Sequence, residues 1–183
     1  ERFLADWEAA SGAIEKPDIA PLNGASVAVV GSGPAGITVA SDLVLLGYEV
    51  TMFEALHEAG GVLTYGIPEF RLPRDTLDIE LHNALRLGVQ MRTGAEIGNG
   101  EGQIPMAKLE QDFDAVLLAT GCMAASPLPL QGDWEKRELR GLEGVEYGLD
   151  FLMQMHRGVK KTVGKRVAVV GAGFTALDCA RVA

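Results

Sequence analysis

The feature that most constrains the fold of this chain is a glycine pattern between two apolar runs. Residues 31–36 read GSGPAG, so Gly31, Gly33 and Gly36 have the spacing G-x-G-x-x-G, and the apolar run at 25–30 precedes them. The first glycine of such a turn allows a tight bend, and the second lets backbone N–H groups approach a pyrophosphate. The third lets the following helix, whose N-terminus carries partial positive charge, pack close to the strand. The pattern therefore predicts a dinucleotide-binding β-α-β unit.

An acidic residue after the second apolar run strengthens this prediction. The run at 48–54 is expected to form the next strand, and Glu54 ends it. A carboxylate at this distance from the turn is placed to accept hydrogen bonds from ribose hydroxyls. The acid indicates an adenosine dinucleotide and leaves NAD and FAD both open. The glycine doublet at 60–61, and a small-residue turn with Thr120 and Gly121 after another apolar strand, favour a long, flavin-type cofactor.

Hydrophobic periodicity organises the rest of the chain into helices and strands. The helix expected at 74–88 should pack one side against a sheet, and that side holds Leu77, Leu81, Ala84, Leu85 and Leu87. We further expect an amphipathic helix at 1–10, a Pro-rich linker at 15–24, strands at 89–93 and 114–121, and a helix at 144–156. Residues 165–183 repeat the opening order of strand, glycine turn and helix. This internal repeat predicts a second nucleotide-binding unit.

Composition and charge exclude several classes of protein. The hydrophobic content of 48% and charged content of 22% indicate a globular chain. The net charge of −9 argues against a nucleic-acid surface, because Lys and Arg carry phosphate binding. No apolar run has the length of a bilayer span, so we expect no membrane span and a cytoplasmic protein. The chain starts at Glu1 without Met and stops at Ala183 inside an expected helix, and we expect it to be part of a longer protein.

The cysteines and histidines carry no metal-binding or disulfide pattern. Cys122 and Cys179 lie far apart, which fits a reducing compartment, and we interpret each as a small buried packing residue rather than a redox centre. A thioredoxin-reductase-like C-x-x-C acceptor is absent from the sequence. His57, His82 and His156 have no clustered ligands, so we expect surface or capping roles and no metal site.

A longer stretch resembles a known family. Residues 27–75 resemble the FAD-binding segment of the small subunit of NADPH-dependent glutamate synthase, a module also found in the N-terminal half of dihydropyrimidine dehydrogenase. The most specific part of this resemblance is YGIPEFRLP at 65–73. The segment at 1–7 is similar to the helix that follows cysteine-rich iron–sulfur segments in this family. The segment at 142–152 is similar to its linker helix, which leads into an NAD(P)H domain.

The resemblance implies a set of cofactor contacts. Those to FAD are Gly31, Gly33, Pro34, Ala35, Gly36, Glu54 at the ribose, Gly61, Val62, Leu63, Arg71 toward the flavin or its phosphates, and Ile97 near the adenine, with Thr120 and Gly121 added from the small-residue turn. The second turn resembles the family's NAD(P)H turn and supplies Gly171, Gly173, Thr175 and Ala176. Phe174 departs from the family, which usually carries a polar residue there. The choice between NADH and NADPH stays open, because the residues that select normally follow the next strand.

The expected architecture is an α/β protein: a Rossmann-like FAD-binding domain with the beginning of a second Rossmann-like NAD(P)H-binding domain. We assign an N-terminal helix and linker to 1–23, part of the FAD-binding domain with its linker helix to 24–158, and the truncated start of the NAD(P)H-binding domain to 159–183. A flavin accepts a hydride and can release single electrons, so we expect no catalytic acid or base in this chain.

The resemblance implies a flavoprotein subunit that transfers electrons between NAD(P)H and a larger redox partner, through FAD and iron–sulfur clusters outside this segment. Within that class the alternatives are a glutamate synthase small subunit and an electron-input or bifurcating subunit of an aldehyde, formate or ferredoxin oxidoreductase complex. A non-catalytic FAD-containing scaffold module, with Phe174 marking a lost NAD(P)H site, is the alternative of another class. The apolar side of the first helix, with Phe3, Leu4 and Trp7, is expected to pack on a domain or on a partner.

Overall fold

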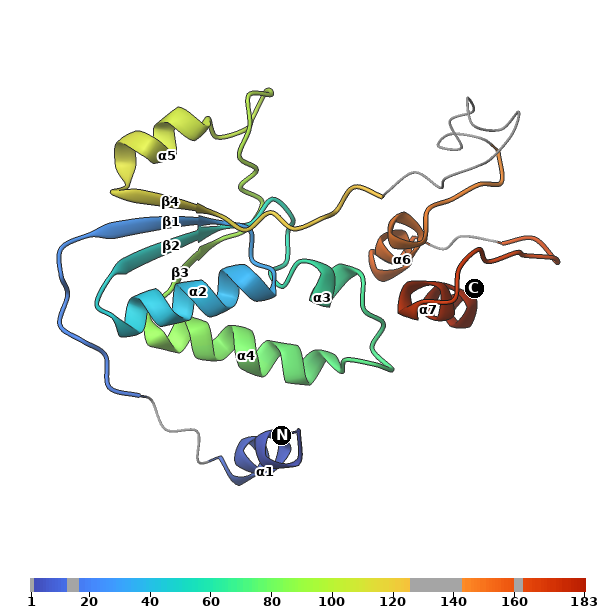
Figure 1. The fold of residues 1–183 in the computed structure, drawn as a ribbon, viewed down its shortest axis with the longest axis horizontal. Coiled ribbons are helices and arrows are strands. Elements are labelled where there is room, and N and C mark those ends of the chain that lie inside the picture. The colour runs from blue at the N-terminus through green and yellow to red at the C-terminus, as the bar shows by residue number, and fades with distance from the viewer. Residues whose placement is uncertain (1, 13–16, 126–142, 160–162) are drawn as a thin grey trace.

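The centre of the molecule is a parallel four-stranded sheet (Figure 1). The computed structural model describes residues 2–12, 17–125, 143–159 and 163–183. The strand order is β3-β2-β1-β4. The bounds of the strands are β1 Ser26–Val30, β2 Glu49–Phe53, β3 Gln90–Arg92 and β4 Ala115–Leu118. The expected α/β class is therefore confirmed.

The two central strands are buried because their residues are apolar on both faces. Strand β1 reads SVAVV and β2 reads EVTMF, and the last four residues of each are buried. A parallel sheet covered on both faces requires such continuous apolar runs, unlike the alternating pattern of a half-exposed sheet. The register sets Val29 of β1 beside Met52 of β2 and beside Leu117 of β4. The sheet therefore fixes where the turn after β1 lies.

Helices cover both faces of the sheet. Figure 1 shows α2 (Pro34–Leu45) and α4 (Arg74–Leu87) on one face and α5 (Met106–Asp112) on the other. Two clusters of buried side chains fill the two interfaces: Val27, Val29, Ala40, Val44, Val50, Met52, Ala84 and Val89 under α2 and α4, and Ala28, Val30, Phe53 and Leu109 under α5. Sequence periodicity did not predict α5, which has only 7 residues, or the single-turn helix α3 (Val62–Tyr65).

The prediction that Leu85 lies on the packed side of α4 is wrong. Leu77 and Ala84 are buried, whereas Leu85 is 46% exposed. Successive residues of a helix are rotated by about 100°, so the residue after Ala84 lies at the margin of the buried side. A leucine at that margin is ordinary for a surface helix.

In its described residues, the C-terminal part of the chain holds two helices and no strand. Helix α6 (Gly148–His156) packs on α7 (Phe174–Val182) through Phe151, Leu152 and Cys179. The strand expected at 165–170 is wrong: its described residues are not in a strand, and Val167, Val169 and Val170 are exposed. A parallel strand forms by pairing with a neighbour, and the described sheet contains only β1 to β4.

The N-terminal helix is present, but it is not packed on the rest of the described chain. Helix α1 (Arg2–Ser11) carries Phe3, Leu4 and Trp7, and each of these side chains is more than half exposed. The described residues leave these side chains exposed, so packing on a domain outside the described residues stays a prediction. A partner stays a prediction. Within the described ranges, no helix combines the length and apolar character needed to cross a bilayer.

Candidate dinucleotide-binding site

The first glycine turn lies at the carboxyl ends of β1 and β2, beside the end of β4. Ligands of open α/β sheets bind at this edge, where the strand order reverses. Gly31 has φ +105°, and its N–H donates to the carbonyl oxygen of Phe53 at 2.8 Å. A Cβ on Gly31 would lie 2.3 Å from the carbonyl oxygen of Ala119, in the segment that follows β4. Both the backbone conformation and this close approach therefore require glycine at position 31.

The other two glycines of the turn have different reasons for their presence. A Cβ on Gly36 would lie 2.0 Å from the carbonyl oxygen of Gly31, which is the close helix–strand approach expected of the third glycine. At Gly33 the backbone, with φ −69° and ψ −178°, is open to any residue, and an added Cβ would meet no atom within 4 Å. The fold therefore does not need glycine at position 33. The open space before it is what a bound diphosphate requires.

The start of α2 offers hydrogen-bond donors toward that space. Gly33 is the N-cap residue and provides no side-chain cap, and Pro34 follows at the first helical position without an N–H. The N–H of Ile37 donates to the carbonyl oxygen of Gly33 at 3.0 Å. The N–H groups of Ala35 and Gly36 precede the first intrahelical bond, and they lie at the positive end of the helix dipole. This arrangement fits an anionic group with several oxygen acceptors.

Glu54 is buried beside the turn and is already partly hydrogen-bonded. Its carboxylate accepts from the Ser32 N–H at 3.1 Å, from the Ser32 hydroxyl at 2.5 Å and from the Leu56 N–H at 2.9 Å. A carboxylate has about four acceptor positions, so about one position is left for a ribose hydroxyl. The buried charge is therefore held in place by the protein before any sugar is bound.

Ser32 connects the turn to the glycine doublet, and our sequence analysis missed it. The Gly60 N–H lies 3.0 Å from the Ser32 hydroxyl oxygen and 3.1 Å from the Ser32 carbonyl oxygen. Gly61 has φ +56°, and a Cβ on it would come within 3.1 Å of the Gly33 Cα. The variable position after the first glycine is thus occupied by a small hydroxyl residue that bonds to both Glu54 and the doublet. A small polar residue inside the glycine pattern was the available signal.

The structure gathers most of the predicted FAD contacts around the first turn. Val62 and Leu63 begin α3 directly after Gly61, and the Leu63 N–H donates to the carbonyl oxygen of Gly60 at 3.1 Å. The Cα of Thr120 is 3.3 Å from the position of a Cβ on Gly31, and Gly121 follows with φ +70°. These segments, far apart in sequence, therefore border one space.

Two predicted residues are directed elsewhere in this structure. The side chain of Ile97 packs in the core under α5, so a cofactor contact there would come from its backbone. Arg71 donates from Nε to Oδ1 of Asp178 at 2.5 Å, and its guanidinium lies 5.0 Å from the centre of the Phe174 ring. Asp178 was not singled out by the sequence analysis, since nothing local to α7 indicates a partner so distant in the chain.

The second turn has the same local geometry as the first. Gly171 has φ +128°, and Gly173 is the N-cap residue of α7 with φ −80° and ψ 174°. An added Cβ on Gly173 would meet no atom within 4 Å. Ala176 fills the third position, and its Cβ is 3.4 Å from the position of a Cβ on Gly171. Thr175, next to it, borders a hollow of about 320 Å³ that Val62 and Arg71 also line.

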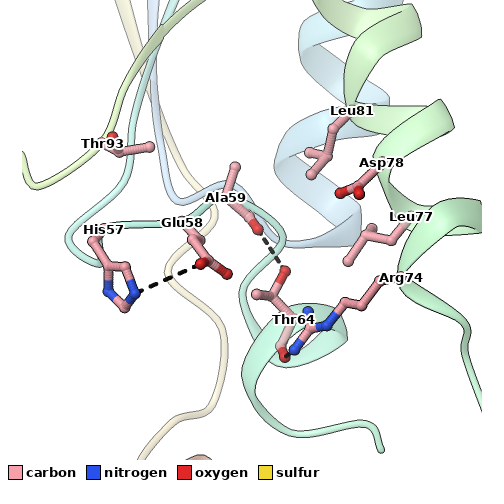
Figure 2. A pocket seen from close by; sticks show the side chains of 9 residues that line it. All are labelled: His57, Glu58, Ala59, Thr64, Arg74, Leu77, Asp78, Leu81 and Thr93. Atoms are coloured by element: carbon pink, nitrogen blue, oxygen red, sulfur yellow. Dashed lines mark hydrogen bonds and ion pairs between the residues drawn. The ribbon is translucent and has the colours of Figure 1, made fainter. Parts of the chain in front are cut away.

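A further hollow of about 460 Å³ lies between the loop before α3 and helix α4 (Figure 2). Its lining comprises His57, Glu58, Ala59, Thr64, Arg74, Leu77, Asp78, Leu81 and Thr93. Polar groups here engage one another: the Thr64 hydroxyl donates to Ala59, and Arg74 donates to the Thr64 carbonyl oxygen. The imidazole of His57 lies 3.7 Å from the Glu58 carboxylate. We assign no ligand to this hollow.

Tyr65, from the distinctive 65–73 segment, is the centre of the histidine contacts. Its hydroxyl accepts from the Glu58 N–H at 3.0 Å and lies 3.0 Å from Nδ1 of His57. Its carbonyl oxygen is 2.7 Å from Nδ1 of His156. Burial raises the pKa of the Tyr65 phenol above its ordinary value, with the nearby charge of Glu58 adding to the effect. Two of the three histidines therefore have structural partners.

The cysteines differ from one another. Cys179 is buried as expected, its thiol hydrogen-bonds to the carbonyl oxygen of Gly148 at 3.4 Å, and burial raises its pKa. Cys122 is exposed, so the expectation of a buried packing residue is wrong there, because no described element covers the chain after β4. In the part of the chain that the structure describes, no group of three or more His, Cys, Asp or Glu residues could hold a metal ion.

Comparison with known proteins assigns a family. Residues 25–183 match the family described as "Pyridine nucleotide-disulphide oxidoreductase". The chain is 40% identical over 98% of its length to "NADP(+)-dependent formate dehydrogenase subunit beta" of Moorella thermoacetica, covering 24% of that protein. It is 39% identical over 86% of its length to "Glutamate synthase [NADPH] small chain" of Mycobacterium tuberculosis, covering 33% of it. The chain thus spans between about a quarter and a third of these relatives.

Two further matches concern the expected resemblance and the fold. The chain is 32% identical over 98% of its length to "NAD-dependent dihydropyrimidine dehydrogenase subunit PreT" of Salmonella typhimurium, covering 41% of that protein. The expected relation to glutamate synthase small chains and to dihydropyrimidine dehydrogenase is therefore confirmed. The structure "Mycobacterium tuberculosis FprA in complex with NADPH" matches with a TM-score of 0.60 at 20% identity, covering 76% of this chain and 31% of that one. At this identity the likeness concerns the fold alone.

Proposed function

Because the chain belongs to the pyridine nucleotide-disulphide oxidoreductase family, we propose that it is part of a flavoprotein subunit that transfers electrons between NAD(P)H and a redox partner through FAD. The family confirms the expected oxidoreductase class. The observation that carries the proposal is the open space at Gly33, where the fold itself does not need glycine, before the uncapped start of α2. That space and those donors suit the diphosphate of a dinucleotide.

The residues around the first turn fit FAD. The N–H groups of Ala35 and Gly36 would hold the diphosphate, and Glu54 would accept from the ribose with its remaining acceptor position. FAD, when bound, supplies the chemistry of accepting a hydride and passing on single electrons. The chain's own part is to bind and orient the cofactor. Gly61 would keep the chain close to the turn without a side chain in the way.

The second turn would hold NAD(P)H. Gly173 repeats the geometry of Gly33, with open space and no side-chain cap at the start of α7. We keep the division into an FAD unit at 24–158 and the start of an NAD(P)H unit at 159–183, after an N-terminal helix and linker at 1–23. The selecting residues for NADH or NADPH would follow the next strand, so the coenzyme preference is open.

We further propose a larger redox partner and iron–sulfur clusters outside this segment. Support comes from the names of relatives, which include a "subunit beta" of a formate dehydrogenase and a glutamate synthase "small chain". The exposed Phe3, Leu4 and Trp7 of α1 would suit a contact with such a partner or with a neighbouring domain.

A cytoplasmic location and the absence of nucleic-acid binding stay predictions. The electron acceptor and the direction of flow are open between the glutamate synthase type and the electron-input or bifurcating type.

A second candidate function is a scaffold module that keeps FAD only as a structural group. Phe174 favours it, because an apolar ring that is 75% exposed stands at the first residue of α7, where the family usually carries a polar residue. Loss of a polar contact at this position would weaken NAD(P)H binding without affecting the first turn.

One experiment separates the two candidates. The full-length protein is purified, its visible absorption spectrum is recorded, and NADPH or NADH is added without oxygen. The proposed function predicts a yellow protein whose flavin absorption bleaches within seconds with at least one of the two coenzymes. A yellow protein that stays oxidised with both would support the scaffold module, and a colourless protein that takes up no added FAD would contradict both.

A further inference from the structure

One side of α7 is docked on a corner of the chain formed by Phe70 and Arg71. Phe174, Asp178 and Arg181 are spaced by four and three residues, so they share one side of the helix. Asp178 accepts from Nε of Arg71, and Phe174 lies under the same guanidinium. In the opposite direction, the guanidinium of Arg181 lies 3.8 Å from the centre of the Phe70 ring. The Arg71–Asp178 ion pair is therefore accompanied by two arginine–aromatic contacts between α7 and the segment at 70–71.

The ion pair is not an ordinary surface pair. The side chain of Asp178 is only 7% exposed, and that of Arg71 is 36% exposed. Exposed pairs contribute little, but a carboxylate buried to this degree depends on its partner, because removing the partner leaves an uncompensated charge. The contact joins positions 107 residues apart in the chain. It therefore constrains where α7 lies relative to the 65–73 segment.

The pair also borders a hollow between the segment that follows the first turn and the start of α7. The hollow beside it is lined by Val62 and Arg71 from the side of the first turn, and by Phe174, Thr175 and Asp178 from the start of α7. Arg71 uses its Nε toward Asp178, and a guanidinium has four more N–H donors on its terminal nitrogens. An arginine held in this way is pre-organised, since its long side chain has lost the freedom that would otherwise oppose ordered contacts.

We infer that Asp178 is a positioning residue that holds Arg71 at the junction of the two nucleotide-binding units and so sets how closely the two bound nucleotides approach. The inference rests on the proposed function. Transfer between two bound groups needs near-contact geometry, and a misplacement of about 1 Å can cost about a hundredfold in rate. Phe174 has a part in the same arrangement, because its ring supports the guanidinium that Asp178 holds. This gives the residue that departs from the family a role on the FAD side of the junction.

The test uses the full-length protein loaded with FAD, with Asp178→Asn, Arg71→Lys and the double variant. We expect Asp178→Asn to lower the rate of flavin reduction at saturating coenzyme by about tenfold or more, with KM changed less than about threefold. Arg71→Lys should also reduce the flavin more slowly than the wild type, because an ammonium lacks the planar fork of the guanidinium. The matched control is Asp112→Asn, which removes an acid from the exposed Lys108–Asp112 pair on α5 and should leave rate and KM unchanged.

Thermal unfolding supplies a readout that does not depend on activity. The two single variants should not add: the double variant should lose little more melting temperature than the worse single variant, because both remove one interaction. If Asp178→Asn does not fold, Phe174→Leu tests the same arrangement at an exposed position. It should fold normally and lower the reduction rate by about two- to fivefold.

The outcomes separate the inference from the proposed function. A wild-type flavin that neither coenzyme reduces would contradict the proposed function and, with it, the positioning inference. A reducible wild type with an unchanged rate in Asp178→Asn would overturn the inference alone, and so would additive losses of melting temperature. Non-additive melting temperatures with unchanged rates would make the pair purely structural, which also contradicts the inference.

Discussion

The two glycine turns of this chain agree in local geometry and differ in their surroundings. In each, the first glycine is left-handed, with φ +105° at Gly31 and +128° at Gly171. In each, the second glycine is an extended N-cap residue with open space at its Cβ position. The first turn follows a buried strand of a four-stranded sheet, whereas the residues before the second are exposed and not in a strand. Turn geometry is thus set by nearby residues, and strand formation by distant ones.

The comparison also separates two reasons for glycine. At Gly31 and Gly36 a Cβ would collide with backbone atoms, so the fold itself needs glycine there. At Gly33 and Gly173 nothing in the protein occupies the Cβ position, so glycine is explained by what binds. At the third position of the second turn Ala176 is accepted, which shows that its helix is held less closely to its turn. Substitutions at these positions should therefore differ in their cost.

The largest effect is expected from Gly36→Ala. The new Cβ would lie 2.0 Å from the carbonyl oxygen of Gly31, so α2 must move away from β1. We expect the free energy of unfolding to fall by about 3 kcal/mol, as for strong overpacking of a core, measured by urea denaturation. Ala176→Gly, the matched change in the second turn, should cost about 1 kcal/mol through helix propensity alone. Equal costs at the two positions would show that the turns do not differ in packing.

A smaller loss is expected from Glu54→Ala, which removes the carboxylate that the first turn has and the second lacks within the described residues. The N–H groups of Ser32, which is buried, and of Leu56, which is half-buried, would lose their acceptor. The free energy of unfolding of the FAD-free protein should fall by about 2 kcal/mol. Glu54→Gln, which keeps one acceptor oxygen, should lose less. A neutral result for Glu54→Ala would mean that the carboxylate serves only the cofactor.

The smallest effect concerns the strand pairing that supports the first turn. Asp114 accepts from the Ser26 N–H at 2.8 Å and from the Ser26 hydroxyl at 3.0 Å, joining the starts of β4 and β1. These hydrogen bonds lower the pKa of the Asp114 carboxyl. A carboxyl with a lowered pKa stabilises the fold above its unfolded value, about 3.9, and this contribution is lost as the pH falls through the folded value.

Melting temperatures of wild type and Asp114→Asn, measured from neutral to acidic pH, check this prediction. The wild type should melt slightly higher at neutral pH, and the difference should narrow as the pH falls below about 4. A difference that widens on acidification would give the shift the opposite sign. Asp112→Asn, in an exposed pair on α5, is the matched control and should follow the wild type more closely.

Sequence reasoning succeeded where the signal is local. The glycine spacing identified the first turn, and runs such as VAVV predicted the buried strand before it, because these patterns depend on residues a few positions apart. The prediction of a strand at 165–170 failed, although its residues resemble those of β1. A strand must pair with a neighbouring strand, and the described sheet provides none for this segment. The exposure of Cys122 and Leu85 also depended on which elements cover them.

The candidate site shows the same limit. Gly33 and Glu54 were recognisable from spacing, while the bonds of Ser32 to Glu54 and to the glycine doublet appeared only in three dimensions. The pairing of Arg71 with Asp178 was likewise not visible, because no periodicity links residues so far apart. The sequence could therefore name the turn and its acid, but not the contacts that hold them together.

The most direct test compares cofactor binding in Gly33→Val and Gly173→Val, each in the full-length protein. Both substitutions enter open space at an extended N-cap residue, so without cofactor both variants should melt near the temperature of the cofactor-free wild type. The melting temperatures are compared without cofactor because a bound cofactor itself adds stability. We expect Gly33→Val to purify without FAD, and Gly173→Val to keep FAD but no longer to be reduced by NAD(P)H. A folded Gly33→Val protein that retains FAD like the wild type would contradict this expectation.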